Sequence, residues 1–130
     1  REEGAIPLFY PINKRENNKI NIGTAGGMTR LSTGYTFLNI QEHSKYIRKN
    51  IENIEISKVY DIGKKYKFLD EIFLRVLSKH PEKMPNIFSK IFNGSYSSAI
   101  KFLSNKSNIF EDISIILKMP KWIFIKSIFN

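Results

Sequence analysis

The residues best suited to chemistry in this sequence form one short segment rich in glycine and hydroxyl side chains. It covers residues 23–35, GTAGGMTRLSTGY, and follows an apolar run that ends at Ile22. Glycine lets a backbone approach a ligand closely, and a helix that begins after such a turn directs free amides and its positive dipole end outward. A strand, a glycine turn and a helix in this order therefore suit an anionic or electron-rich ligand.

The same segment also has an ordinary structural explanation, which is a tight connection between a strand and a helix. Its glycine spacing differs from the G-x-G-x-x-G of dinucleotide-binding folds, and no lysine follows the last glycine as in a P-loop. Ser32 and Thr33 are expected to cap the following helix by accepting hydrogen bonds from its first amides. Arg30 could neutralise a phosphate, although an exposed surface arginine is the more common role.

Two adjacent carboxylates and two histidines are the other titratable candidates. Glu2 and Glu3 stand at the start of the chain, where solvated charges are usual, but a buried carboxyl with a raised pKa could act as a general acid. His43 lies among polar residues of a predicted helix, so we expect it to be exposed. His80 precedes Pro81 at a predicted helix end. With two separated histidines and no cysteine, we expect no metal site.

Size and composition limit the chain to one modest globular unit of 130 residues, 42% of them hydrophobic. The absence of cysteine excludes disulfides and a thiolate nucleophile. A net charge of +9 is compatible with nucleic acid or an anionic membrane as partner, but Lys, Asn and Ile are all abundant, so the charge alone assigns no partner. Clustered arginine and aromatic residues are missing, and we therefore expect no nucleic-acid partner.

Two short strands and a long helix are expected to position the glycine turn. Residues 5–10 and 19–23 are apolar runs joined by a polar loop, which predicts an antiparallel pair. A helix with apolar residues in steps of three and four is predicted to follow Thr33 and to end between residues 50 and 55. Its predicted inward face consists of Phe37, Ile40, Ile47, Ile51 and Ile54.

From about residue 57 onward the pattern indicates helices only. One is predicted to end at about Lys79, and shorter ones to begin near Pro85, near Ser95, at Asn108 or Ser107, and at Lys121. The helix after Asn108 is predicted to turn inward Ile109, Phe110, Ile113, Ile116 and Leu117. The predicted fold is therefore an α+β or α/β fragment with a strand pair, glycine turn and long helix in residues 1–56, followed by an all-helical region in residues 57–130.

The order of several N-terminal residues resembles the lycopene cyclase family of flavoproteins. A Glu2-Glu3 pair and an Ile-Pro at residues 6–7 precede the turn, which itself reads Gly-x-Ala-Gly and is followed by Thr-Gly-Tyr at residues 33–35. The likeness covers about residues 1–49, and the Thr-Gly-Tyr element is its most specific part. Two positions depart from the pattern: Thr24 stands where many related flavoproteins have Asp, and Leu31 where Pro is usual.

The resemblance implies a two-layer flavin-binding fold and an enzyme that closes the end of lycopene to a β-ionone ring. A proton adds to the terminal double bond, the carbocation cyclises and a proton is lost, with no net redox change. FAD is then needed in its reduced form, which NAD(P)H maintains. The family's G-x-G-x-x-G strand and its acidic motif are not in this sequence, so the resemblance implies the C-terminal part of a longer enzyme, inactive on its own.

Carried over by position, the resemblance implies a flavin site along the glycine segment. Residues of the turn would lie beside the ribityl chain and pyrophosphate, namely Gly23, Thr24, Ala25, Gly26 and Gly27. Thr33, Gly34 and Tyr35 would open the helix that points at the isoalloxazine ring. Glu3, or less favourably Glu2, would be a substrate-side acid, with a structural ion pair as the alternative.

The last segment, residues 118–129, mixes Trp, Phe and Ile with Lys, which is typical of a helix lying in a membrane interface. Packing of this helix on its neighbours is the ordinary alternative. Because carotenoids dissolve in bilayers, the resemblance implies a cytoplasmic enzyme attached peripherally to the membrane. Two alternatives stay open: another FAD-dependent isoprenoid oxidoreductase or monooxygenase, and a non-enzymatic basic helical module that binds membranes.

Overall fold

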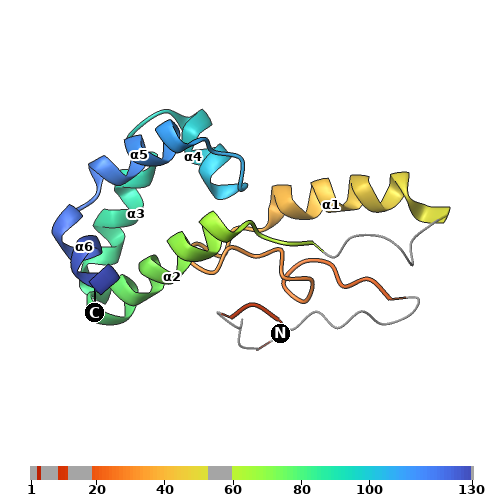
Figure 1. Ribbon diagram of the computed structural model, residues 1–130, viewed down its shortest axis with the longest axis horizontal. Helices are drawn as coiled ribbons and strands as arrows, with labels where there is room; N and C mark the ends of the chain where they lie inside the picture. Colours follow the sequence, from red (N-terminus) through yellow and green to blue (C-terminus); the bar gives the residue numbers. More distant parts are fainter. Residues whose placement is uncertain (1–2, 4–8, 12–18, 53–59, 130) are drawn as a thin grey trace.

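The computed structural model describes residues 3, 9–11, 19–52 and 60–129. Helices α2 to α6 form one cluster, and α1 extends away from it (Figure 1). A short 3₁₀ turn, η2 (Pro81–Lys83), connects α2 and α3. The helices of the described residues are α1 (Phe37–Lys49), α2 (Lys64–Lys79), α3 (Met84–Phe92), α4 (Tyr96–Leu103), α5 (Ile109–Lys118) and α6 (Lys121–Phe129).

The predicted α+β fold is wrong, because the described part of the chain is helical and contains no β-strand. Residues 19–23, predicted as a strand, form no more than an isolated bridge at Lys19 followed by irregular backbone, in which Ile22 remains 47% exposed. The chain then turns back so tightly that a Cβ atom on Gly26 would lie 2.3 Å from the carbonyl oxygen of Asn21. A short apolar run cannot supply its own partner strand, and the turn packs on it instead. The other predicted strand falls largely on residues 5–8, outside the described residues.

The core lies within the cluster of α2 to α6. Helix α2 packs against α6, and α3 packs against α4 and α5. Burying each large apolar side chain contributes about 1.5–3 kcal/mol to folding. The buried core residues are Phe73, Val76, Met84, Ile87, Ile91, Ala99, Phe102, Ile115 and Met119. Prolines and an Asn-Gly pair set the ends of these helices as the sequence predicts, with Pro85 in the first turn of α3 and Pro120 directly before α6.

Helix α5 turns a different face to the core than the one predicted. Asp112 and Ile115 are buried, and so is Met119 just beyond its end. Asp112 fixes this rotation, because its carboxylate accepts hydrogen bonds from Lys65 Nζ at 2.7 Å and from Ser107 Oγ at 2.5 Å. The residues predicted to face inward are instead exposed, with Phe110 at 83%: Ile109, Phe110, Ile113, Ile116 and Leu117.

Helix α1 is also anchored by polar rather than apolar side chains. It begins at Phe37, which is 62% exposed, whereas Asn39 and His43 are buried. Asn39 Nδ2 donates to the carbonyl oxygen of Met28 at 2.8 Å, and the His43 ring meets that of Tyr60 edge-on at 5.7 Å between centroids. The predictions of an inward Phe37 and an exposed His43 are therefore wrong, because this helix packs against a loop whose carbonyl groups need donors.

Candidate functional site

The glycine-rich turn closes on itself through its own backbone. Gly26 N donates to Gly23 O at 3.1 Å, and Gly27 N donates to Thr24 O at 3.0 Å. Met28 N also donates to Gly23 O, at 3.0 Å. Gly23 and Gly27 both have φ near +70°, which residues with a side chain rarely adopt. The amides of residues 26–28 are therefore used inside the turn and do not point at an outside phosphate.

A second loop, residues 30–35, follows the turn and is closed at its base by Arg30. The Arg30 carbonyl oxygen accepts from Gly34 N at 2.8 Å and from Thr33 N at 3.3 Å, and Arg30 N donates to Tyr35 O at 2.9 Å. Gly34 has φ +71°, a conformation that costs other residues roughly 1–2 kcal/mol. We call this segment the 30–35 loop.

The hydroxyl groups of this loop do not cap a helix, contrary to the prediction from sequence. Helix α1 starts only at Phe37, with Thr36 as its N-cap residue and no side-chain cap hydrogen bond. Ser32 Oγ instead donates to Asp70 Oδ1 at 2.6 Å, and Thr33 Oγ1 accepts from Tyr35 N at 3.3 Å. The Ser32 hydroxyl is used by Asp70 of α2 and the Thr33 hydroxyl by the loop itself, so the helix begins later than the pattern of Ser and Thr suggests.

The 30–35 loop lines a hollow of about 380 Å³, which we call the Tyr35 hollow. No atom lies within 4 Å of the position that a Cβ atom on Gly34 would take. The Thr36 hydroxyl, which is not among the residues that line the hollow, is buried without a hydrogen-bond partner among the described residues. The lining residues are Thr33, Gly34 and Tyr35 from the loop, Phe88, Ile91 and Phe92 from α3, and Leu103 from α4.

A buried ion pair between Arg30 and Asp70 stands directly behind this loop. Arg30 is 0% and Asp70 1% exposed, and Arg30 Nη2 lies 2.6 Å from Asp70 Oδ1. Arg30 Nη1 also donates to the carbonyl oxygen of Phe102 at 2.7 Å. The guanidinium carbon lies 4.9 Å from the ring centroid of Tyr66 and 5.1 Å from that of Phe102, which places the charge between two aromatic faces.

Asp70 receives hydrogen bonds from several further donors. Leu31 N donates to Oδ2 at 3.1 Å, and the hydroxyl of Tyr10 donates to the same oxygen at 3.0 Å. Burial, and secondly the neighbouring Asp70 carboxylate, raise the pKa of the Tyr10 phenol. The cluster thus ties residues 10, 30, 31 and 32 to the middle of α2.

Sequence reasoning missed this pair. An exposed surface position is the more common role for an arginine such as Arg30, whereas the structure buries it completely against Asp70. One signal was present for Asp70, which stands four residues after Tyr66 and three before Phe73, on the buried face of α2. No local signal pointed to Arg30, because its partner lies 40 positions away.

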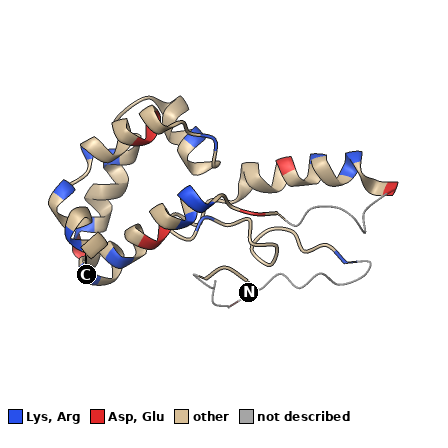
Figure 2. Ribbon diagram, viewed as in Figure 1, with Lys and Arg blue, Asp and Glu red and all other residues tan. Residues whose placement is uncertain are grey.

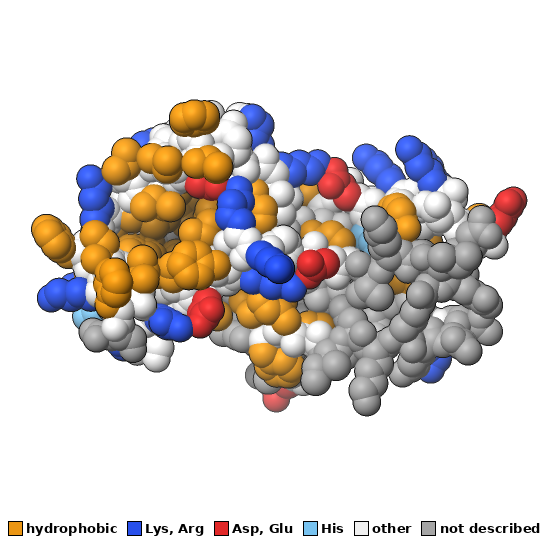
Figure 3. All heavy atoms as spheres, viewed as in Figure 1, with side chains coloured by type: hydrophobic (Ala, Val, Ile, Leu, Met, Phe, Trp, Pro, Cys, Tyr) orange, Lys and Arg blue, Asp and Glu red, His pale blue; other side chains and the backbone are white. Residues whose placement is uncertain are grey.

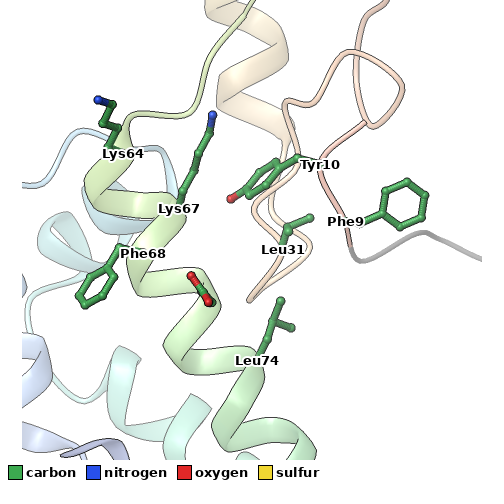
Figure 4. A pocket seen from close by; sticks show the side chains of 8 residues that line it. Phe9, Tyr10, Leu31, Lys64, Lys67, Phe68 and Leu74 are labelled. Atoms are coloured by element: carbon green, nitrogen blue, oxygen red, sulfur yellow. The ribbon is translucent and has the colours of Figure 1, made fainter. Parts of the chain in front are cut away.

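A second hollow, of about 570 Å³, lies between residues 9–10, Leu31 and α2. Figure 4 shows Tyr10 directed toward α2 and Phe9 directed away from it. The sequence did not predict this hollow. Its lining residues are Phe9, Tyr10, Leu31, Lys64, Lys67, Phe68, Glu71 and Leu74.

The predicted site residues separate into two groups. Thr33, Gly34 and Tyr35 line the Tyr35 hollow, whereas the turn residues Gly23, Thr24, Ala25, Gly26 and Gly27 are not among its lining residues. Glu2 lies outside the described residues, and Glu3 is exposed and lines neither hollow. The residues around Gly34 fit a flat ring system, because they combine open space at the position of a Gly34 Cβ atom with an apolar wall.

Comparison with known protein families matches residues 1–128 to the family described as lycopene cyclase protein. Curated proteins and solved structures give no significant match. The match includes the glycine turn, the Tyr35 hollow, the Arg30–Asp70 pair and helices α1 to α5 in full, and so it reaches far beyond the N-terminal residues that carry the resemblance in the sequence. With nearly the whole length matched, the chain belongs to the lycopene cyclase family.

Proposed function

We propose that these residues form the C-terminal part of an FAD-dependent lycopene β-cyclase, which protonates one end of lycopene and closes it to a β-ionone ring without net redox change. The observation that carries the proposal is the family match over residues 1–128 together with the Tyr35 hollow, whose loop wall contains the Thr-Gly-Tyr element. A missing N-terminal part of the same polypeptide completes the nucleotide-binding strand in this proposal.

In this proposal Thr33, Gly34 and Tyr35 hold the ring end of the cofactor. Gly34 allows close approach because nothing beyond its two chain neighbours lies within 4 Å of its Cβ position. Reduced FAD, kept so by NAD(P)H, would supply negative charge that stabilises a carbocation in an apolar site. The amides of residues 26–28 donate hydrogen bonds within the turn. In this proposal the turn residues therefore contact the ribityl chain of FAD through groups other than these amides.

The apolar wall of the hollow suits the chemistry of ring closure. Phe88 and Phe92 lie one helical turn apart on α3, and Ile91 stands between them. Such side chains place no water-binding group next to a carbocation, and an aromatic face attracts positive charge. Glu3, or Glu2, stays the proposed substrate-side acid within this chain.

The proposal is tested by expressing the full-length gene that contains these residues in cells that accumulate lycopene, and by separating their carotenoids. We expect β-ring carotenoids, and we expect Phe92→Asp to reduce them at least tenfold because it places a charge in the apolar hollow. Phe68→Asp is the matched control, since Phe68 is an exposed phenylalanine that lines the other hollow. Unchanged lycopene with the wild-type gene would refute the proposal, whereas oxygen uptake or net NAD(P)H consumption would favour an isoprenoid monooxygenase or oxidoreductase.

We also propose that the enzyme attaches peripherally to the cytoplasmic side of a membrane. No helix of the described residues is long and apolar enough to cross a bilayer. However, α5 and α6 expose an α5–α6 apolar surface, and Figure 3 shows apolar side chains gathered over this part of the molecule with Lys and Arg around them. Figure 2 shows Lys and Arg spread over several helices, where anionic lipid headgroups would attract them. The surface consists of Ile109, Phe110, Ile113, Leu117, Trp122, Ile125 and Phe129.

A further inference from the structure

We propose that Arg30 and Asp70 are positioning residues, whose buried ion pair holds the 30–35 loop in place as the ligand-facing wall of the Tyr35 hollow. The inference rests on the proposed function, because the ligand that this wall serves is the flavin. The pair does not line the hollow itself, so its effect passes through the residues that it holds.

Arg30 forms the closed end of the loop through its backbone. Its carbonyl oxygen accepts from Gly34 N at 2.8 Å and its amide donates to Tyr35 O at 2.9 Å. Any displacement of the Arg30 backbone therefore moves Gly34 and Tyr35 directly. These two residues are also the ones that line the hollow.

The Arg30 side chain joins this wall to the opposite one. Nη1 donates to the carbonyl oxygen of Phe102 at 2.7 Å, and the next residue, Leu103, lines the hollow from α4. Nη1 also donates to Asn105 Oδ1 at 3.1 Å. Asn105 adopts φ +62°, an unusual conformation for a residue with a side chain, in the bend that follows α4. The guanidinium thus connects the loop with the end of α4.

Asp70 holds the loop at three successive residues. It pairs with the Arg30 guanidinium through both carboxylate oxygens, accepts from Leu31 N at 3.1 Å and accepts from Ser32 Oγ at 2.6 Å. Because Asp70 lies in the middle of α2, a helix fixed in the core by Phe73 and Val76, it gives the loop a rigid anchor. An ion pair used in this way supplies geometry, and removing one partner leaves the other buried and uncompensated.

The chain offers a matched control for this role. Asp112 on α5 is a buried carboxylate that accepts from Lys65 Nζ at 2.7 Å and from Ser107 Oγ at 2.5 Å. Like Asp70, Asp112 accepts hydrogen bonds from one cationic side chain and from one serine hydroxyl. Among the described residues, its side-chain hydrogen bonds go to Lys65 and Ser107 and not to the 30–35 loop. Asp112→Asn therefore reports the general cost of losing a buried carboxylate.

The test compares wild type, Asp70→Asn and Asp112→Asn in the purified full-length protein. Hydrogen exchange is measured over residues 28–36 without cofactor, and FAD binding is measured by flavin fluorescence. In Asp70→Asn we expect at least tenfold faster exchange at the amides of Arg30 and Gly34 and at least tenfold weaker FAD binding. Asp112→Asn is expected to lower the melting temperature while leaving both quantities within twofold of wild type.

Unchanged loop exchange and FAD affinity in Asp70→Asn would overturn the inference. So would equal losses of affinity in both variants, because the effect would then be one of general stability. If Asp70→Asn does not fold, Ser32→Ala takes its place, with at least threefold weaker FAD binding expected and unchanged binding counting against the inference. A wild-type protein that binds no FAD would refute the proposed function, and the positioning of a flavin with it. The exchange measurement would then still show separately whether the ion pair fixes the loop.

Discussion

At the level of single residues, buried polar side chains fix the segment of residues 28–35, whereas buried apolar side chains fix the helices α2 to α6. Arg30, Asp70, Asn39 and His43 are each buried, and the first three make side-chain hydrogen bonds that reach distant segments. A loop exposes carbonyl and amide groups that must be satisfied when another segment covers them. Donors and acceptors are therefore found at positions where a helix packing on other helices would carry Leu or Ile.

His43 gives this observation a pH dependence. Burial lowers the pKa of its imidazole below the ordinary value of about 6.5, so the folded protein holds it neutral where the unfolded chain would protonate it. The unfolded state then binds more protons in the interval between the two pKa values, and the free energy of unfolding falls as the pH decreases below about 6.5.

We expect His43→Gln to flatten this dependence, measured as the melting temperature between pH 7.5 and pH 5. His80→Gln is the control, because it removes the other histidine of the chain, which is half-buried at the end of α2 with Nδ1 3.6 Å from Glu82 Oε1. This control should keep the wild-type slope. An identical slope in His43→Gln and wild type would contradict the assignment.

At the level of helices, the rotation of α5 shows how one polar residue decides which face is buried. By hydrophobicity alone, Ile109, Phe110, Ile113 and Leu117 would face inward. The contacts of Asp112 with Lys65 and Ser107 turn the helix so that these residues face solvent. A buried carboxylate without partners is costly, whereas an exposed apolar side chain on a surface costs little, so the ion pair sets the rotation.

Helix α5 starts near Asn108, as the sequence predicted, and the structure shows that a capping box fixes this start. Asn108 Oδ1 accepts from Glu111 N at 2.8 Å, and Glu111 Oε2 accepts from Asn108 N at 2.9 Å. We expect Asn108→Ala to reduce the free energy of unfolding by about 1 kcal/mol in urea denaturation. Asn108→Asp keeps an acceptor at the cap and should retain most of that stability; equal losses in both variants would show that the cap contributes little.

At the level of the whole molecule, contacts cross the predicted division between residues 1–56 and 57–130. The Arg30–Asp70 pair, the Tyr10–Asp70 hydrogen bond and the ion pair between Glu42 and Lys106 all join the two parts. The division into two units stays a prediction. Whatever its outcome, the N-terminal loops depend on α2 for their positions.

The α5–α6 apolar surface supplies the prediction for membrane attachment. Trp122 on α6 is 78% exposed and Phe110 on α5 is 83% exposed. The double variant Phe110→Ala/Trp122→Ala therefore removes two large groups that could enter a lipid interface. We expect it to reduce flotation of the full-length protein with anionic phospholipid vesicles at least fivefold.

Phe37→Ala is the control for flotation, because Phe37 is exposed on α1, which extends away from α5 and α6 (Figure 1). It should float like the wild type. Equal flotation of the double variant and the wild type would rule out this surface as the attachment site, and a wild-type protein that never floats would refute peripheral attachment.

The sequence by itself determined the family, through Gly23 to Gly27 and the Thr-Gly-Tyr of residues 33–35, and it determined most helix ends from α2 onward, through Pro81, Pro85, Asn108 and Pro120. These are local signals, since a proline or a cap acts within one turn of the chain. The glycine turn, by contrast, did not become part of a sheet, because a strand needs a partner that no local pattern can provide.

Only the tertiary structure decided which polar residues are buried. Arg30 and Asp70 are 40 positions apart, and Asp112 is 47 positions from Lys65, so their pairing depends on the packing of whole helices. That packing determined the rotation of α5, the position of the 30–35 loop and the surface left apolar. A buried charge needs a partner that tertiary packing brings close to it, and composition and residue spacing do not show which residue that partner is.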